Sequence, residues 1–242
     1  MSPTIHPGAE KIIVALDTQD LSQAKAWVAT LTGAVGAFKL GLEFLSAHGP
    51  QGVREVQAAG ADRVFADTKF CDIPNTVAGA VRSICGIDPW LLNVHATAGS
   101  AAMRAARKSA EEYAEESGRP RPFVIAVTVL TSLDQDALAE IGVAGSVEEQ
   151  VVRLAKLSQA SGMDGVVASP LEIRAIREAC GPDFLIVTPG VRPTGGATHD
   201  QARVATPEAA IAAGADYLVI GRAITGASNP RAAAETIAAS LP

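Results

Sequence analysis

Four charged residues of alternating sign lie along two short apolar segments and the turn after them. Lys39 lies in the second apolar segment of the chain, Asp67 and Lys69 end the third, and Asp72 follows three residues later. Side chains two apart on a strand point to one face, so Asp67 and Lys69 should face a common site. Charges that point into a protein interior are costly unless they are paired. We therefore predict an alternating acid–base network of these four residues, with purely structural ion pairs as the alternative.

A second polar group follows the seventh and eighth apolar segments. It comprises Pro189-Gly190-Val191-Arg192, Gln201 and Gly221-Arg222. Two guanidinium groups, with a glycine that lets the backbone approach closely, suit a dianionic phosphate. Loops at these places commonly bind phosphate in α/β barrels. The alternative is that Arg192 and Arg222 are surface charges, with Gly195-Gly196 between them as a flexible tip.

Other candidate residues are weaker. No group of His, Cys and Asp has the spacing of a metal site, so we predict no metal. No nucleophile elbow and no Walker loop occurs in the sequence. His95 closes the fourth apolar segment, where we favour a packed side chain over a substrate contact. Cys71 is interpreted as a small spacer, because no histidine is evidently placed to activate it as a nucleophile.

Eight short segments rich in β-branched and apolar residues must position these groups. They are Lys11–Asp17, Ala37–Gly41, Arg63–Lys69, Leu91–His95, Phe123–Leu130, Gly165–Ala168, Phe184–Thr188 and Tyr217–Gly221. Several are continuous apolar runs, which is typical of parallel strands covered on the outside by helices. Asp17 would then end the first strand, near Lys39 in the second.

Helical segments lie between these strands and have recognisable ends. Ser169, Thr206 and Asn229 each precede a proline, which is the pattern of a helix cap followed by the first turn. Gly60 and its counterparts Gly162 and Gly214 each follow a helical stretch and precede an Asp and a strand. Glycine at such a junction takes the left-handed conformation that ends a helix. One strand–helix unit is therefore repeated along the chain.

Eight such units without a Gly/Ser-rich linker predict an α/β fold in which residues 1–242 form a single (β/α)8 TIM barrel. The competing architecture is an open doubly wound sheet. The sequence ALDTQDLS after the first strand lacks the glycine fingerprint of that fold. In a barrel, the chemistry belongs at the carboxyl ends of the strands.

Composition excludes several classes of protein. The net charge of −6 argues against a wide basic surface for nucleic acid. The apolar runs are too short to span a bilayer, and no secretory signal is evident at the N-terminus. Three widely spaced cysteines predict neither a disulfide framework nor a zinc site, and they fit a reducing compartment. We therefore expect a cytoplasmic protein with no membrane or nucleic-acid partner.

The segment DTKFCDIPNT, from Asp67 to Thr76, resembles the signature of the orotidine 5'-monophosphate decarboxylase family. The resemblance extends over nearly the whole chain. Further matching motifs occur in the family's order: Ala15-Leu16-Asp17, Phe38-Lys39-Leu40-Gly41, Leu130-Thr131-Ser132, Thr188-Pro189-Gly190-Val191-Arg192, Asp200-Gln201 and Ile220-Gly221-Arg222. Cys71 stands where many members have His, and Ala98-Gly99 where a Gly pair is usual. These departures affect only local packing.

The resemblance implies a lyase that converts orotidine 5'-monophosphate to UMP and CO2 in pyrimidine biosynthesis without any cofactor. Lys69 would deliver a proton to C6 of the pyrimidine, with Asp67 beside the substrate carboxylate. The other implied substrate-binding residues are Asp17 and Lys39 at the ribose, Thr131 near the pyrimidine, and Arg192, Gln201 and Arg222 at the phosphate; Ile73, Pro189 and Gly221 belong to the same motifs. A homodimer is also implied, in which Asp72 and Thr76 enter the partner's site.

Two other functions remain as alternatives. One is a Mg²⁺-dependent sugar-acid-phosphate decarboxylase or hexulose-phosphate synthase of the same barrel group. Those relatives generally have an acidic residue near the position of Lys39 and lack the run from Ile73 to Thr76, so these positions argue against them. The other is a phosphate-binding barrel without catalysis, which should have lost some of the four charged residues.

Overall fold

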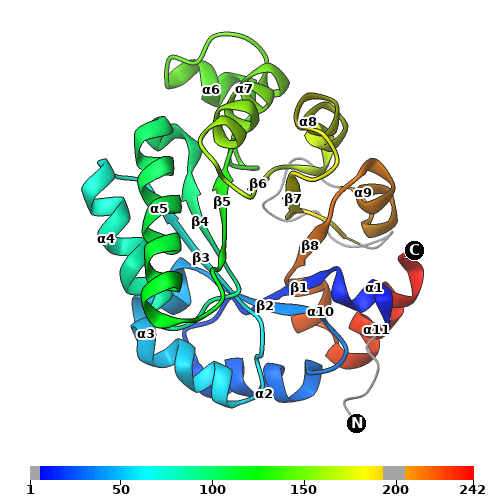
Figure 1. Cartoon of the computed structure of the whole chain (residues 1–242). Helices are drawn as coiled ribbons and strands as arrows, with labels where there is room; N and C mark the ends of the chain where they lie inside the picture. Colours follow the sequence, from blue (N-terminus) through cyan, green and yellow to red (C-terminus); the bar gives the residue numbers. More distant parts are fainter. Residues whose placement is uncertain (1–5, 193–204) are drawn as a thin grey trace.

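The computed structural model describes residues 6–192 and 205–242, and its strands form one closed parallel barrel (Figure 1). The strand order follows the sequence around the barrel. The strands are β1 (Ile12–Ala15), β2 (Ala37–Leu40), β3 (Val64–Phe70), β4 (Leu91–His95), β5 (Phe123–Val127), β6 (Gly165–Val167), β7 (Leu185–Thr188) and β8 (Tyr217–Ile220). All eight predicted strands are present, and the predicted TIM barrel is confirmed.

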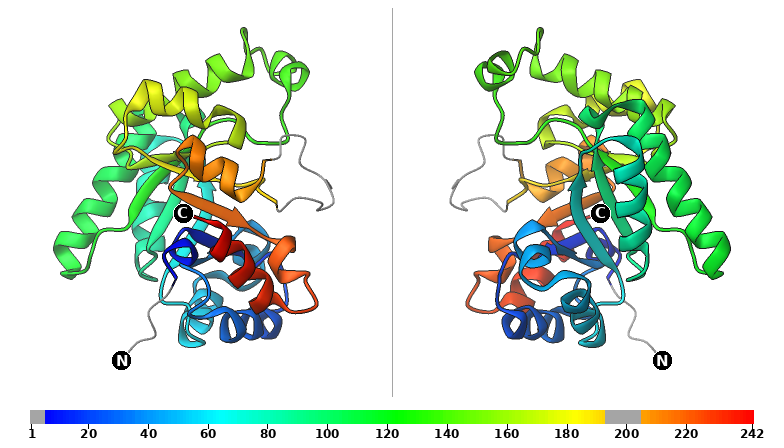
Figure 2. Two further views of the ribbon diagram at one scale, coloured as in Figure 1. Left: turned by 90° about the vertical axis from the view of Figure 1, so that its right-hand side faces the viewer. Right: turned by 90° about the vertical axis from the view of Figure 1, so that its left-hand side faces the viewer.

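Helices surround the strands on the outside, as the end-on and side views show (Figures 1 and 2). The α-helices are α1 (Pro7–Glu10), α2 (Leu21–Leu31), α3 (Leu42–Ala58), α4 (Pro74–Cys85), α5 (Gly99–Ser117), α6 (Gln135–Glu140), α7 (Val147–Ala160), α8 (Ile173–Cys180), α9 (Pro207–Ala213), α10 (Arg222–Thr225) and α11 (Pro230–Ser240). Two 3-10 turns, η1 (Ala96–Ala98) and η2 (Pro170–Glu172), complete the described elements. No helix in the described ranges is long and apolar enough to cross a membrane.

The predicted helix ends are largely observed. The side chains of Thr206 and Asn229 accept hydrogen bonds from backbone N–H groups in the first turns of α9 and α11. Ser169 caps the 3-10 turn η2, and α8 begins only after that turn, so this predicted helix start is displaced along the chain. Gly60 and its two counterparts all have positive φ, as the junction pattern predicts.

Residue parity along the strands separates the barrel interior from the layer beneath the helices. Every buried residue of the inner cluster has an odd number: Ile13, Ala15, Ala37, Phe65, Leu91, Ile125, Val187 and Val219. Side chains alternate between the two faces of a strand, so even-numbered residues such as Val14 and Leu92 pack against the helices. Odd-numbered polar residues near the carboxyl ends of the strands therefore point into the barrel.

Candidate active site

A cavity of about 540 Å³ lies at the carboxyl ends of the strands, where a (β/α)8 barrel places its chemistry. Its lining combines charged residues in or just after β1, β2 and β3 with residues of the loops after β5, β7 and β8. The lining residues are Ala15, Asp17, Lys39, Phe65, Asp67, Lys69, Val127, Val129, Leu130, Thr131, Val167, Ala168, Pro189, Gly190, Val191, Arg192, Val219, Gly221, Arg222 and Ala223. Phe65 and several valines make part of this lining apolar.

Asp17, Lys39, Asp67 and Lys69 form a continuous chain of ion pairs along one wall of the cavity. Nζ of Lys39 lies 3.1 Å from Oδ1 of Asp17 and 3.2 Å from Oδ2 of Asp67. Nζ of Lys69 lies 2.6 Å from Oδ1 of Asp67. The carboxylate of Asp67 thus lies between two ammonium groups, and the signs alternate from β1 to β3.

Burial and the partner charges together set the pKa values of Asp67 and Lys39. The Asp67 side chain is only 9% exposed and that of Lys39 only 11%. Burial by itself raises the pKa of Asp67, but attraction to Lys39 and Lys69 outweighs that effect and holds the pKa below its ordinary value. For Lys39, burial lowers the pKa, and attraction to Asp67 and Asp17 outweighs it, so the pKa lies above its ordinary value. Both groups are therefore charged at neutral pH.

Lys69 has an unusual backbone conformation. Its φ is 49°, in the left-handed region that non-glycine residues seldom adopt. Such a conformation costs about 1–3 kcal/mol and persists only where surrounding contacts impose it. The backbone N–H of Lys69 donates a hydrogen bond of 2.7 Å to Oδ1 of Asn93. Lys69 is thus held by its neighbours on both its backbone and its side chain.

The part of the cavity that adjoins Asp17 is formed by the loops after β7 and β8, because β8 pairs with β1. Pro189 and Arg192 come from the first loop, and Gly221 and Arg222 from the second. Two arginines therefore line the same cavity as the two lysines. This part of the site has the chemistry to bind an anionic group.

Three predicted residues lie outside this cavity in the single chain. Asp72, Ile73 and Thr76 are exposed, and Ile73 is 67% accessible. Oδ1 of Asp72 accepts a hydrogen bond from the N–H of Ile73, and no ion pair among the described residues joins Asp72 to a lysine. This corrects the predicted network within one chain, in which Asp17 takes the place of Asp72. The physical reason is that Asp72 lies beyond the end of β3, where the chain turns outward into α4.

The remaining predicted residues are accounted for as follows. Thr131 lines the cavity just after β5. Gln201 lies outside the described residues. His95 is half-buried at the end of β4, and burial followed by repulsion from Lys69 lowers its pKa, so the ring is neutral at pH 7. Cys71 is exposed.

Sequence reasoning missed two residues beside the charged chain. Asn93 is fully buried in β4, and its Nδ2 donates a hydrogen bond of 2.7 Å to Oδ1 of Asp67. Gly41 follows β2 and leaves space for the ammonium of Lys39. A polar residue at an odd-numbered position in an otherwise apolar strand was the available signal for Asn93, whereas the need for a glycine after β2 depends on three-dimensional packing.

Comparison with known proteins agrees with this geometry. The model of the "Orotidine 5'-phosphate decarboxylase / HUMPS family" matches residues 10–237. Proteins named orotidine 5'-phosphate decarboxylase from Moorella thermoacetica and Rhodospirillum rubrum are 57% and 54% identical to the chain, covering 96% and 95% of it and 92% and 93% of their own lengths.

Solved structures agree as well. The crystal structure of orotidine 5'-phosphate decarboxylase from Lactobacillus acidophilus is 35% identical, with a TM-score of 0.84 over 95% of this chain and 98% of that one. An uncharacterized conserved protein from Geobacillus kaustophilus, also 35% identical, gives a TM-score of 0.83 over 96% of this chain and 100% of that one. From the family model and these relatives, this chain belongs to the orotidine 5'-phosphate decarboxylase / HUMPS family.

Proposed function

We propose that this protein is a carboxy-lyase that converts orotidine 5'-monophosphate to UMP and CO2 in pyrimidine biosynthesis. The observation that carries the proposal is the ammonium of Lys69, which lies 2.6 Å from a buried carboxylate inside a cavity that two arginines also line. Relatives more than half identical over nearly the whole chain are named for this activity.

The reaction leaves an electron pair on C6 of the pyrimidine when the bond to CO2 breaks. Ring resonance does not spread this charge, and cofactors normally provide an electron sink for such chemistry. In the proposed mechanism Lys69 stabilises the developing carbanion by its positive charge and then transfers a proton to C6. The neutral amine regains its proton from water. An interaction that strengthens as charge develops lowers the barrier itself rather than only the energy of binding.

Asp67 contributes by its charge. In our proposal it lies beside the substrate carboxylate, and loss of CO2 relieves the repulsion between the two. Two charges 4 Å apart interact by about 4 kcal/mol at an effective dielectric constant of 20. Enzymes lower barriers by about 8–23 kcal/mol. Repulsion alone therefore cannot account for the lowering of the barrier, and stabilisation of the carbanion by Lys69 must contribute as well.

The remaining residues are proposed to bind the rest of the substrate. Asp17 and Lys39 hold the ribose hydroxyls, Thr131 contacts the pyrimidine, and Pro189 and Gly221 shape the loops beside it. Arg192, Gln201 and Arg222 bind the phosphate. These contacts with non-reacting parts of the substrate hold the pyrimidine ring in place beside Lys69 and so contribute to catalysis.

We further propose that the active form is a homodimer in which Asp72 and Thr76 complete the partner's site, with Ile73 beside them. The exposure of this segment at the start of α4, including a large apolar side chain, supports the proposal. A cytoplasmic location is proposed from the cysteine pattern of the sequence.

One specific observation argues against the Mg²⁺-dependent alternative. The ammonium of Lys39 occupies the position between the carboxylates of Asp17 and Asp67, where a divalent cation would need both carboxylates as ligands. The competing positive charge favours cofactor-free chemistry at this wall of the cavity.

The test is a direct assay of the purified chain. The absorbance of orotidine 5'-monophosphate should fall at the same rate with and without excess EDTA. Loss of activity in EDTA, restored by Mg²⁺, would support the metal-dependent alternative. Binding of UMP without any turnover would support a non-catalytic barrel.

A further inference from the structure

Asn93 connects the two residues on which the proposed chemistry depends. Its side chain donates from Nδ2 to Oδ1 of Asp67 and accepts at Oδ1 from the backbone N–H of Lys69, each at 2.7 Å. The orientation of the amide follows from these partners, because a carboxylate only accepts and an N–H only donates. Asn93 has no exposed surface, so no water replaces either contact readily.

The backbone of β3 departs from regular pairing at this point. Ala66 pairs with Leu92 and Phe70 with Val94, so β3 advances four residues while β4 advances two. An irregularity of this kind redirects a side chain and takes backbone groups out of the ladder. The side chain of Asn93 accepts the Lys69 N–H within this irregular stretch, at the residue with left-handed φ.

The same amide also fixes the rotation of the Asp67 carboxylate. Oδ1 of Asp67 receives hydrogen bonds from Nδ2 of Asn93 and Nζ of Lys69, at 2.7 and 2.6 Å. Oδ2 is thereby turned toward Nζ of Lys39, at 3.2 Å. Asn93 therefore helps to fix the plane of the Asp67 carboxylate between the two lysines.

We propose that Asn93 is a positioning residue for decarboxylation, which holds the left-handed backbone of Lys69 and the rotation of Asp67 so that the Lys69 ammonium is aimed at the reacting carbon. This proposal rests on the proposed function, because its main test measures the rate of decarboxylation. Asn93 itself does not line the cavity, so its action on the substrate is through Lys69 and Asp67.

Two variants separate the two hydrogen bonds. Asn93→Ala removes both. Asn93→Asp keeps an acceptor for the Lys69 N–H but sets a second carboxylate against Asp67, and two carboxylates this close share one proton. Thr68→Val is the matched control. Oγ1 of Thr68 donates a 2.7 Å hydrogen bond to the backbone carbonyl of Asn93, and removal of this hydroxyl leaves both side-chain hydrogen bonds of Asn93 intact.

We expect Asn93→Ala to lower kcat about 100-fold, the scale of a misplacement of about 1 Å, while the Kd for UMP measured by calorimetry stays within about threefold. In Asn93→Asp, the proton shared by Asp67 and the new carboxylate should be lost as the pH rises. The activity of this variant should therefore fall with rising pH in a step that the wild type lacks. Thr68→Val should keep the wild-type kcat. Thermal unfolding checks that each variant is folded, and Asn93→Ser replaces Asn93→Ala if the latter does not fold.

The proposal is overturned if a folded Asn93→Ala variant keeps kcat within threefold of wild type, if Thr68→Val loses as much, or if UMP binding falls in parallel with kcat. Should the wild-type chain itself not decarboxylate the substrate, the proposed function fails, and crystal structures still test Asn93. In that case the Asn93→Ala structure should show Lys69 with negative φ and its ammonium away from Asp67, and an unchanged Lys69 would refute the proposal.

Discussion

A β-carbon on Gly41 would lie 3.0 Å from Nζ of Lys39, closer than nearly all real contacts of this kind. The backbone of Gly41, with φ −93° and ψ −174°, is extended and open to any residue. Space, and not backbone conformation, therefore favours glycine at this position. The missing side chain leaves room for a buried ammonium that holds Asp17 and Asp67 together.

Gly41→Ala should therefore lower kcat/KM about tenfold, because Lys39 must shift by a few tenths of an ångström from both carboxylates. Steady-state kinetics and UMP affinity measure the effect. Gly79→Ala is the matched control, since a β-carbon there meets nothing within 4 Å in α4. Equal kinetics for the two variants would show that the space beside Lys39 is not critical.

Lys69→Ala should abolish turnover, with a loss of about 1,000-fold or more, because both the charge near C6 and the proton source are removed. Binding of UMP should persist, since the other cavity residues remain. Single-turnover measurements and calorimetry with UMP make the comparison. Near-normal rates would refute Lys69 as the proton source.

A mixture of Lys69→Ala and Asp72→Asn proteins should recover part of the activity that each lacks alone. If each site takes Asp72 from the partner, a hybrid dimer contains one site with both residues intact. Activity is measured after the two inactive proteins are mixed and allowed to exchange subunits, with sedimentation to determine the oligomeric state. A fully active monomer would contradict the shared site.

Acid should weaken the fold partly through Asp67. Because its folded-state pKa lies below the ordinary value of 3.8, ionised Asp67 stabilises the fold above that pH, and this contribution is lost as pH falls through the folded pKa. Asp67→Asn should cost about 3 kcal/mol at neutral pH. In urea titrations the difference from wild type should shrink below pH 4. Parallel stability curves for the two proteins would contradict this account.

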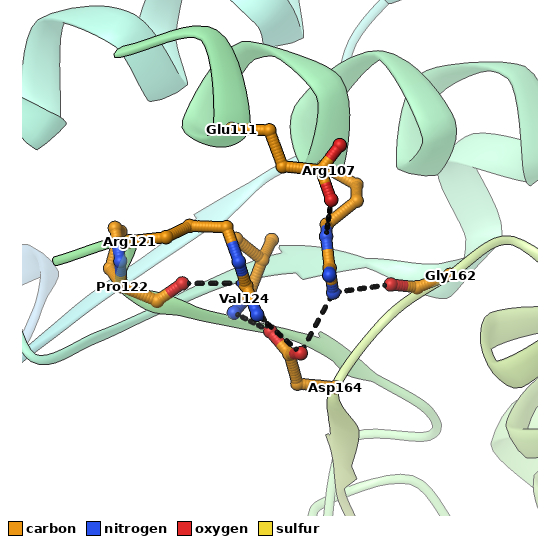
Figure 3. Close-up of polar contacts among 7 residues, drawn as sticks. All are labelled: Arg107, Glu111, Arg121, Pro122, Val124, Gly162 and Asp164. Atoms are coloured by element: carbon orange, nitrogen blue, oxygen red, sulfur yellow. Dashed lines mark hydrogen bonds and ion pairs between the residues drawn. The ribbon is translucent and has the colours of Figure 1, made fainter. Parts of the chain in front are cut away.

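Asp164, at the opposite end of the barrel, should matter for stability alone. It accepts two hydrogen bonds from Arg121, one from Arg107 and one from the N–H of Val124, all at 2.7–2.9 Å (Figure 3). Asp164→Ala should lower the free energy of unfolding by about 2–4 kcal/mol, because it leaves the partly buried guanidinium of Arg121 without a carboxylate and that of Arg107 with only Glu111.

The kinetic constants of Asp164→Ala should equal those of wild type, because Asp164 precedes β6 and lies far from the carboxyl ends of the strands. Glu112→Ala, which removes an exposed ion pair with Lys108, should change stability by less than about 0.5 kcal/mol and serves as the control. A stability loss for Asp164→Ala no larger than that of Glu112→Ala would show that the network contributes little.

Local sequence was sufficient for much of the fold. Apolar runs such as Phe123–Val127 and the glycine junctions at Gly162 and Gly214 reflect short-range rules of burial and backbone conformation, which a single chain segment carries by itself. The motif from Asp67 to Thr76 likewise identified the family without any coordinates. The barrel, and the position of Lys39, Asp67 and Lys69 at the carboxyl ends of its strands, could therefore be predicted from the sequence.

The tertiary structure decided which carboxylates form ion pairs with Lys39 and Lys69. Asp17, and not Asp72, completes the series of ion pairs within one chain, because β1 pairs with β2 while the chain after β3 turns outward. Asn93 contacts Asp67 and Lys69 where the pairing of β3 and β4 is irregular. Gly41 matters because the side chain of Lys39, in β2, extends past the α-carbon of this glycine. Residue type and periodicity mark Asn93 as a polar residue that faces inward, but they do not show which groups it contacts, because those contacts join residues distant in sequence. The space beside Gly41 likewise depends on the three-dimensional position of Lys39.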